Sequence, residues 1–302
     1  MSAPVPPLRV ASAVPVSALP RGADLAYEPK FDGHRMVVFV REEGVLLQAR
    51  SGRNVTAAFP DLAGAARRLP AGTVLDGEVV VWRGGRTDFA AVQRRAAATA
   101  SRAPALARAL PASYAAFDLL AEGGEDLRPL AYRERRARLE ALVGPLGPPL
   151  QPVPMTRDAQ EALTWFGTLH SIGVEGLVIK RVDQAYRGGG RAWRKLRHTT
   201  AGDAAVTGYT GPAARPSALV LTLPDDDTPV VSAPLPPALR AQAGRVLAGR
   251  TRAGGGTATA VGLGEVAYRP VAAGTTAEVE LGTTRHPVVT VLRLRLPEEL
   301  EP

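Results

Sequence analysis

The chain contains no cysteine and very little lysine. Only three of its 37 lysine and arginine residues are lysines, namely Lys30, Lys180 and Lys195. The absence of cysteine excludes disulfide bonds and metal sites built on thiolates. Because arginine supplies almost every other positive charge, each remaining lysine is a candidate for a role that arginine cannot take.

Attack by a neutral amine is such a role. A guanidinium stays protonated in proteins, whereas neighbouring groups can lower the pKa of an ammonium until it becomes a nucleophile. The three lysines are therefore candidates for chemistry, and the local sequence around each one has to decide between chemistry and simple surface charge.

Long apolar runs and an export signal are also missing. No stretch reaches the roughly 18 apolar residues that a membrane-spanning helix needs. The first residues, MSAPVPPLRV, lack a charged region followed by an apolar block. We expect a cytoplasmic, monomeric protein without membrane contact. With 302 residues, of which 45% are hydrophobic, the chain is long enough for two domains with buried cores.

The balance of charge favours a polyanionic partner. The formal net charge is +8, and cations gain affinity for nucleic acids because phosphates release counterions. The basic run RERRAR at residues 133–138 is interpreted as the solvated face of a helix, because charges at this spacing are typical of an exposed surface.

Helix and strand patterns alternate over the first two thirds of the chain, after a Pro-rich start (residues 1–29) that we interpret as irregular. Strands are predicted from runs of apolar and β-branched residues, with a hairpin turning at Glu43–Gly44. These strands cover residues 31–40, 44–50, 73–82, 113–120 and 173–181. Helical periodicity is found over residues 61–69 with Asp61 as the cap, 88–110 with a break at Pro104, 129–143 and 157–173.

The pattern changes near Thr199. Short apolar runs such as SALVLTL (217–223) and VVTVLRLRL (288–296) alternate with Gly, Pro and Asp turns, and one helix is predicted over residues 237–249. About 100 residues of this kind suit a small β-barrel such as an OB-fold. The sequence therefore predicts an α+β fold with two domains, residues 1–199 and 200–302.

A short motif surrounds the first lysine. Lys30 is followed by Asp32, Gly33 and Arg35 in KFDGHR. This Lys-x-Asp-Gly-x-Arg pattern resembles the signature of covalent nucleotidyltransferases, which include DNA ligases, RNA ligases and capping enzymes. A pattern this short also occurs by chance, so its context carries the argument.

Further segments follow in the order found in ATP-dependent DNA ligases, and all three lysines lie in such segments. The chain is most similar to small bacterial ligases without an N-terminal DNA-binding domain. This resemblance implies a nucleotidyltransferase (adenylation) domain followed by an OB-fold domain. The segments are LQARSGRNVTAAFPDL with Arg50, LDGEVVVW with Glu78, YAAFDLL with Phe117, VEGLVIKR with Glu175 and Lys180, and AWRKLRH with Lys195 and Arg197.

The resemblance also implies what these residues do. Lys30 would attack the α-phosphate of ATP and carry AMP covalently, with Arg35, Lys180 and Lys195 lowering its pKa and neutralising the phosphates. Arg50 and Arg197 would add to the cofactor site. Glu78 and Glu175 would hold Mg²⁺ or Mn²⁺, or Glu78 would hold the ribose. Phe117 and Val178 would enclose the adenine, whose edge would meet the backbone at Glu28 and Pro29.

Other residues are assigned structural or uncertain roles. Asp76 and Asp118 are interpreted as structural, and Trp193 is expected to pack against its neighbours. The last basic motif of ligases has its nearest match at Arg285, Arg293 and Arg295, but the spacing is stretched.

The function implied is the sealing of nicks in double-stranded DNA through a lysyl-AMP and a DNA-adenylate, with other DNA-repair proteins as candidate partners. An RNA ligase and a GTP-using capping enzyme are the nearest enzymatic alternatives. A nick-binding repair scaffold with weak turnover is an alternative of another class. An NAD-dependent ligase is disfavoured, because its zinc finger needs cysteines.

Overall fold

The computed structural model describes residues 3–224, 226–260, 264–282 and 289–295. The chain divides into two compact units, Met1–Arg197 and His198–Pro302, and the expected boundary after residue 199 lies close to this division. Among the described residues, no helix is both long and apolar enough to span a bilayer.

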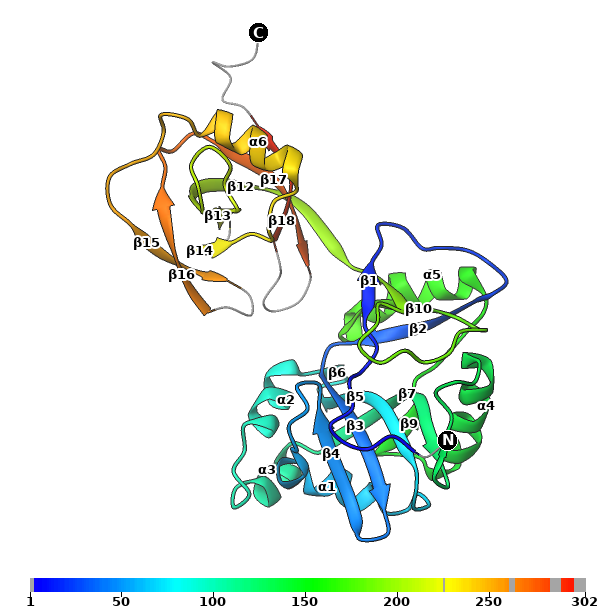
Figure 1. The fold of residues 1–302 in the computed structure, drawn as a ribbon. Helices are drawn as coiled ribbons and strands as arrows, with labels where there is room; N and C mark the ends of the chain where they lie inside the picture. Colours follow the sequence, from blue (N-terminus) through cyan, green and yellow to red (C-terminus); the bar gives the residue numbers. More distant parts are fainter. Residues whose placement is uncertain (1–2, 225, 261–263, 283–288, 296–302) are drawn as a thin grey trace. The chain divides into compact units, whose positions relative to one another are not determined.

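A large mixed sheet forms the centre of the first unit (Figure 1). Its main path runs β4-β3-β5-β7-β8, while β6 pairs with β5 and β9 with β7. The strands are β3 (His34–Arg41), β4 (Gly44–Ala49), β5 (Val74–Arg83), β6 (Arg86–Thr87), β7 (Ala112–Glu122), β8 (Glu125–Asp126) and β9 (Leu150–Pro152).

Both faces of this sheet are covered by other parts of the chain. Accordingly, β3 and β5 carry apolar side chains on both of their faces. On one face, Met36 and Val38 join a core shared with α1, α2 and α4. On the other face, Val37 and Phe39 pack with Leu8 and Trp193, which come from the two ends of the unit. The helices are α1 (Pro60–Ala66), α2 (Phe89–Ala96), α3 (Ala103–Ala109) and α4 (Tyr132–Val143), with 3-10 turns at Thr56–Ala58 and Gly144–Leu146.

A second, smaller sheet in this unit has the order β1-β11-β10-β2. It consists of β1 (Ala13–Pro15), β2 (Leu25–Phe31), β10 (Val174–Arg181) and β11 (Trp193–Arg197). One face packs on α5 (Ala159–Thr168), which leads into a 3-10 turn at Leu169–Ile172. Asp32 and Gly33 connect β2 to β3 and thus the two sheets. A side chain at Gly33 would clash with the Val79 carbonyl, so the tight connection requires glycine.

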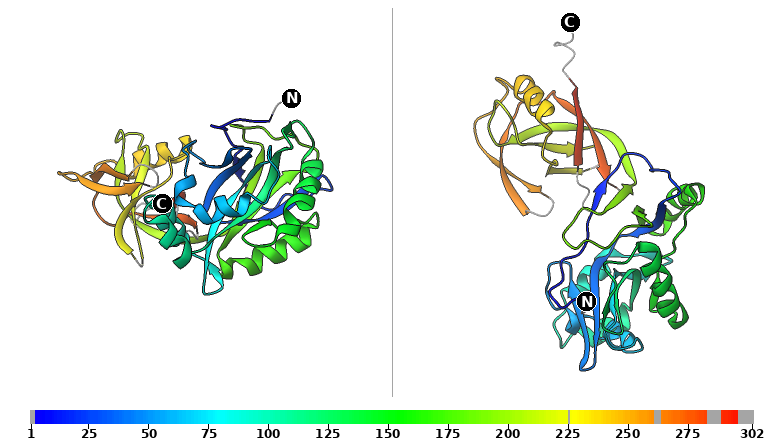
Figure 2. Two further views of the ribbon diagram at one scale, coloured as in Figure 1. Left: turned by 90° about the horizontal axis from the view of Figure 1, so that it is seen from below. Right: turned by 45° about the vertical axis from the view of Figure 1, so that its right-hand side comes forward.

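In its described residues, the second unit is a curled sheet of seven strands with one helix, α6 (Pro237–Val246) (Figures 1 and 2). The path β13-β14-β15-β16-β12-β17-β18 is closed by a further pairing of β12 with β13. Five strands therefore form a small barrel, as the sequence predicts. The strands are β12 (Thr199–Thr210), β13 (Ala218–Leu223), β14 (Asp226–Val231), β15 (Gly256–Ala260), β16 (Gly264–Pro270), β17 (Thr276–Gly282) and β18 (Val289–Arg295).

Three local predictions are wrong. Residues 1–29 are not irregular, since they contain β1 and β2, whose partners lie far along the chain. Asp61 does not cap α1. Its carboxylate instead accepts bonds from the buried Arg95 and from the Ala112 N–H. The break between α2 and α3 covers residues 97–102, and Pro104 stands in the first turn of α3, where a missing N–H is tolerated.

The interpretation of RERRAR as a solvated face is wrong for two of its arginines. Arg135 and Arg136 are 0% and 4% exposed. Arg135 forms a bidentate pair with Asp118 at 2.7 and 3.0 Å, and Arg136 lies 3.6 Å from Glu28. Each buried guanidinium is compensated by a carboxylate from another element, which the local charge pattern of a helix does not reveal.

The buried Asp118–Arg135 pair leads to a prediction on stability. Asp118→Ala is expected to lower the free energy of unfolding of the first unit by about 3–5 kcal/mol, because it leaves Arg135 charged, buried and unpaired. All three tryptophans, Trp82, Trp165 and Trp193, lie in this unit. Urea unfolding followed by tryptophan fluorescence therefore reports on it selectively.

Asp183→Ala is the matched control. Asp183 pairs with Arg181 at 2.8 Å, but both side chains are about half exposed, and such pairs contribute at most about 1 kcal/mol. Equal destabilisation by the two substitutions would contradict the prediction.

Candidate functional site

A cavity of about 820 Å³ opens in the first unit, lined by residues of both of its sheets. Every residue that the sequence assigned to catalysis, to the cofactor or to a metal lines it. These residues are Glu28, Pro29, Lys30, Arg35, Arg50, Glu78, Phe117, Glu175, Val178, Lys180, Lys195 and Arg197.

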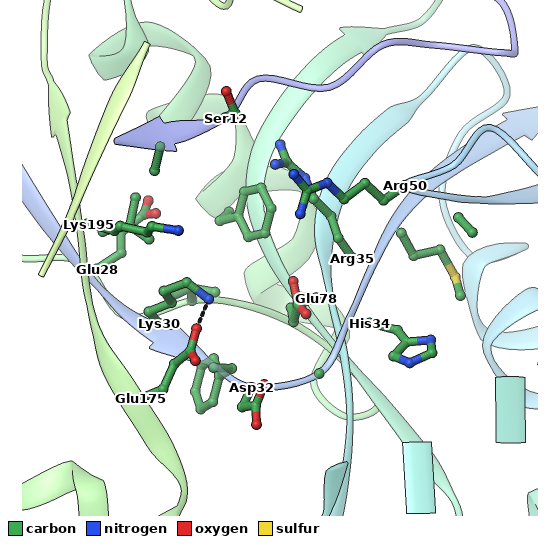
Figure 3. A pocket seen from close by; sticks show the side chains of 18 of the residues that line it. Ser12, Glu28, Lys30, Asp32, His34, Arg35, Arg50, Glu78, Glu175 and Lys195 are labelled. Atoms are coloured by element: carbon green, nitrogen blue, oxygen red, sulfur yellow. Dashed lines mark ion pairs between the residues drawn. The ribbon is translucent and has the colours of Figure 1, made fainter. Parts of the chain in front are cut away.

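Lys30 stands near the end of β2 with its side chain 23% exposed, and it forms an ion pair with Glu175 of β10 (Figure 3). Glu175 is only 5% exposed and also accepts a bond from Arg197 at 3.3 Å. The carboxylate therefore serves two cations. The register of the strands explains this proximity, because Lys30 of β2 lies opposite Gly176, next to Glu175.

The other two lysines have different surroundings. Lys195 is half-buried, and its pKa is lowered by burial and by the nearby cations Arg197 and Lys30. Lys180 is fully buried: its Nζ lies 2.7 Å from Glu28 Oε2 and donates to the Phe117 carbonyl at 2.7 Å. Burial lowers the pKa of Lys180 as well. In this arrangement Lys195 faces the open part of the cavity, while the Lys180 ammonium supports Glu28 and Phe117 from within.

The carboxylate of Glu28 is buried and bonded to three other side chains of the first unit. Its side chain is 2% exposed, accepts a bond from the Tyr132 hydroxyl at 2.5 Å and pairs with Lys180 and Arg136. The carboxylate is therefore fully engaged within the protein, and Glu28 and Pro29 both line the cavity.

Arg35 projects from β3 beside two aromatic rings that contact each other. Its guanidinium carbon lies 5.2 Å from the ring centroids of both Phe117 and Trp193, and it forms a bidentate pair with Asp76 at 3.0 and 2.6 Å. Trp193 is buried and meets Phe117 edge-on at 5.7 Å. Trp193 thus packs as expected, and Asp76 acts structurally by fixing Arg35.

Two acidic side chains of the cavity, Glu78 and Asp32, have a raised pKa. Burial raises the pKa of Glu78 to about 7, with Lys30 and Arg35 opposing the shift and Glu175 adding to it. Burial, followed by the charge of Glu175, also raises the pKa of Asp32. The carboxylates therefore lie close enough to repel one another, so a bound cation would be favoured.

Glu78 and Glu175 suit a hard divalent cation. In the described part of the chain, no three His, Cys, Asp or Glu side chains gather into a complete metal site. Mg²⁺ does not need one, because it usually takes one or two carboxylates and completes its shell with water and substrate phosphates. The carboxylates of Glu78 and Glu175 fit this incomplete kind of site.

The shifted pKa of Glu78 predicts a pH effect on stability. Its usual value is 4.5, so between that pH and about 7 the folded state keeps a proton that the unfolded state releases. Raising the pH through this window favours unfolding. The free energy of unfolding of the first unit is expected to fall by up to about 3 kcal/mol. Glu78→Gln stays neutral and should lose this part of the pH dependence.

Urea unfolding followed by tryptophan fluorescence, at about pH 5 and about pH 8, measures the effect. The difference in unfolding free energy between the two pH values should be smaller in Glu78→Gln than in the unchanged protein. Parallel pH profiles for the two proteins would rule out the raised pKa.

The basic residues assigned to the last motif lie in the second unit. Arg285 lies outside the described residues. Arg293 pairs with Glu278 at 2.6 Å, and Arg295 lies 3.0 Å from Asp203. These two side chains are about half exposed or more, so their ion pairs are open to competition from a phosphate.

Sequence reasoning missed the contribution of the amino-terminal segment to the cavity. Ser12 and Ala13 line it. Arg35 donates to Asp76, which also accepts a bond from the Tyr186 hydroxyl. Ser12, Ala13 and Tyr186 lie in no recognised motif. Ser12 bonds to Gly190, 178 residues away, and Tyr186 bonds to Asp76, 110 residues away, so the local sequence contains no signal for them.

Comparison with known proteins gives consistent matches. Residues 10–197 match the model of the ATP-dependent DNA ligase domain. The chain is 37% identical over 237 residues to DNA ligase C2 of Mycolicibacterium smegmatis, covering 77% of this chain and 66% of that protein. It is 36% identical to DNA ligase C of Mycobacterium tuberculosis, covering 69% of this chain and 60% of that protein. The chain thus spans less than two thirds of these relatives.

Solved structures support the fold. A mycobacterial DNA ligase D complexed with ATP and MES superimposes with a TM-score of 0.51 at 23% identity, covering 96% of both chains. A structure of a Lig E DNA ligase gives a TM-score of 0.61 at 15% identity, covering 95% of this chain and all of the other. At such identities the likeness concerns the fold alone, and it confirms the expected catalytic core of a nucleotidyltransferase domain with an OB-fold domain.

Proposed function

Because the chain belongs to the family of ATP-dependent DNA ligases, we propose that it seals nicks in double-stranded DNA through a covalent lysyl-AMP. One observation carries this proposal: a single cavity contains Lys30, six further lysine and arginine residues, and two carboxylates that suit a divalent metal. Such a site can transfer a nucleotide through an amine.

In the first step, the Nζ of Lys30 attacks the α-phosphorus of ATP. A P–N bond forms, and the bond to the β-phosphate oxygen breaks to release pyrophosphate. Lys30 has to lose its proton and separate from Glu175 before it can attack. Lys195 and Arg197 line the same cavity, and their positive charges would stabilise the phosphate oxygens.

The cofactor assignments follow from the same cavity. Phe117 and Val178 would enclose the adenine, Arg35 and Arg50 would contact the sugar and phosphates, and Glu78 and Glu175 would hold Mg²⁺ or Mn²⁺. A bound divalent cation would supply neutralisation of the triphosphate charge. Lys180 would act indirectly, since its ammonium holds Glu28 and the Phe117 carbonyl in place.

In the second step, a 5′-phosphate oxygen of the nicked strand attacks the AMP phosphorus. The P–N bond breaks, Lys30 becomes the leaving amine and takes up a proton, and a DNA-adenylate forms. In the third step, the 3′-hydroxyl attacks the 5′-phosphate and AMP leaves. Arg293 and Arg295 on the second unit would contribute phosphate contacts to DNA. We propose that the protein acts as a cytoplasmic monomer and meets other DNA-repair proteins at the nick.

A sealing assay tests this function. A duplex with one nick and a labelled 5′-phosphate is incubated with the protein, ATP and Mg²⁺, and the strand length is read on a denaturing gel. We expect sealing of an all-DNA nick, with weaker activity as salt rises because the phosphate contacts are screened. Sealing only of an RNA strand would indicate an RNA ligase. Binding of the nick without sealing would indicate a scaffold.

A further inference from the structure

Arg35 belongs to a closed ring of hydrogen bonds that includes the amino-terminal segment, residues 8–16. Arg35 donates to both carboxylate oxygens of Asp76 and to the Ala11 carbonyl at 2.5 Å. The Tyr186 hydroxyl donates to Asp76 Oδ2 at 2.6 Å and accepts from the Ala11 N–H at 3.0 Å. The ring therefore runs from Arg35 to Asp76, Tyr186, Ala11 and back to Arg35.

The ring is buried, although it adjoins the cavity. Asp76 and Ala11 are fully buried and Tyr186 is 5% exposed, whereas Arg35 lines the cavity. Each nitrogen of the Arg35 guanidinium has a fixed acceptor, and its carbon lies 5.2 Å from the ring centroids of both Phe117 and Trp193, which also contact each other. A buried network of this kind fixes one orientation, because any member that turns leaves a polar group without a partner.

The amino-terminal segment is itself attached at both ends. The buried Gln48 side chain accepts from the Leu8 N–H at 2.7 Å and donates to the Leu8 carbonyl at 2.8 Å. Further along, β1 pairs with β11, where Pro15 lies opposite Lys195. The segment thus passes from the core of the large sheet to the lysine-bearing strand of the small sheet, with Ala11 at the ring between them.

We propose that Tyr186 is a positioning residue for Arg35, which it orients toward the nucleotide by joining Asp76 to Ala11 of the amino-terminal segment. The proposal rests on the proposed function for the identity of the ligand. Tyr186 does not touch the ligand itself. Its hydroxyl donates to Asp76 and accepts from the Ala11 N–H and, at 3.5 Å, from Arg35 Nη2. Its ring packs edge-on against Trp193 at 5.9 Å.

The test removes only this hydroxyl and measures binding of α,β-methylene-ATP, whose α–β bridge is not cleaved. Tyr186→Phe keeps the ring and its packing but leaves the Ala11 N–H without an acceptor. The substitution also removes the hydroxyl's bonds to Asp76 and Arg35, so that Arg35 is held only by Asp76 and the Ala11 carbonyl. We expect the Kd to rise roughly threefold to tenfold, because Arg35 is then less firmly oriented. In self-adenylation, the KM for ATP should rise by a similar factor while kcat changes by less than about twofold.

Two controls separate positioning from general destabilisation. Tyr27→Phe also removes one hydroxyl bond, from Tyr27 to the Pro20 carbonyl at 2.9 Å, and should leave the Kd unchanged. Arg35→Lys keeps the positive charge but lacks the planar guanidinium that the ring of hydrogen bonds holds in place. In that background, Tyr186→Phe should have no further effect on the Kd.

An unchanged Kd in Tyr186→Phe, or an equal loss in both backgrounds, would overturn the inference. The proposed function fails separately: a protein that binds the analogue with this pattern but never forms a covalent AMP adduct supports the role of Tyr186 and refutes the ligase chemistry. Tryptophan fluorescence of each variant checks that the first unit is folded.

Discussion

Replacing Lys30 by arginine is expected to abolish covalent attachment of AMP, with a loss of at least about 10³-fold in the rate of labelling. Arginine keeps a positive charge opposite Glu175, so the ion pair of the cavity survives. A guanidinium does not lose its proton in a protein and cannot act as the attacking amine. Incubation with α-labelled ATP and Mg²⁺, followed by a denaturing gel, measures the covalent label.

Lys195→Arg is the matched comparison, because it makes the same chemical change at another lysine of the same cavity. Lys195 is proposed to stabilise charge and not to carry AMP, so this variant should still become labelled, at a reduced rate. Label in Lys30→Arg that equals the label in the unchanged protein would refute Lys30 as the nucleophile.

Replacing Glu175 by glutamine is expected to reduce self-adenylation by about 10²-fold or more. The carboxylate is nearly buried and contacts both Lys30 and Arg197. Without its charge, Lys30 loses the partner that holds it in the cavity, and the proposed metal loses one of two ligands. The rate of labelling, measured over a series of Mg²⁺ concentrations, should show both a lower maximum and a higher Mg²⁺ requirement.

Glu134→Gln controls for the loss of one negative charge from the same unit. Glu134 on α4 is 48% exposed, and its ion pair with the exposed Arg133 is long at 3.8 Å. We therefore expect no change in labelling. If Glu175→Gln needs no more Mg²⁺ than the unchanged protein, Glu175 does not hold the metal.

The composition of the cavity could be predicted because each motif is short and lies on or beside a strand. Lys30, Arg35, Glu78 and Glu175 lie on β2, β3, β5 and β10, where the alternation of side chains fixes which face they occupy. Arg35 and Glu78 are direct cross-strand partners. The scarcity of lysine gave an independent reason to single out the same positions.

Burial could not be predicted where it depends on distant partners. Lys180 is found in the expected cavity, but its ammonium pairs with Glu28 on another strand, and sequence shows only its charge. The same reason explains the buried Arg135 and Arg136. Their carboxylate partners lie on β7 and β2, so a helical pattern that looks solvated is partly internal.

Long-range backbone pairing explains the other differences. The Pro-rich start was interpreted as irregular, because the strand character of β1 comes from its parallel partner β11, far along the chain. Tyr186 has no motif around it, yet its hydroxyl reaches Asp76, which is 110 residues away. Local propensity carries no information on contacts of this kind.

The central claim is that Lys30 carries AMP, and locating the adduct tests it most directly. The unchanged protein is incubated with ATP and Mg²⁺, digested under conditions that preserve the P–N bond, and analysed by tandem mass spectrometry. The account predicts the mass of one AMP on the peptide that contains Lys30, with the modification assigned to that side chain. AMP on Lys180 or Lys195, or no adduct on any lysine, would contradict it.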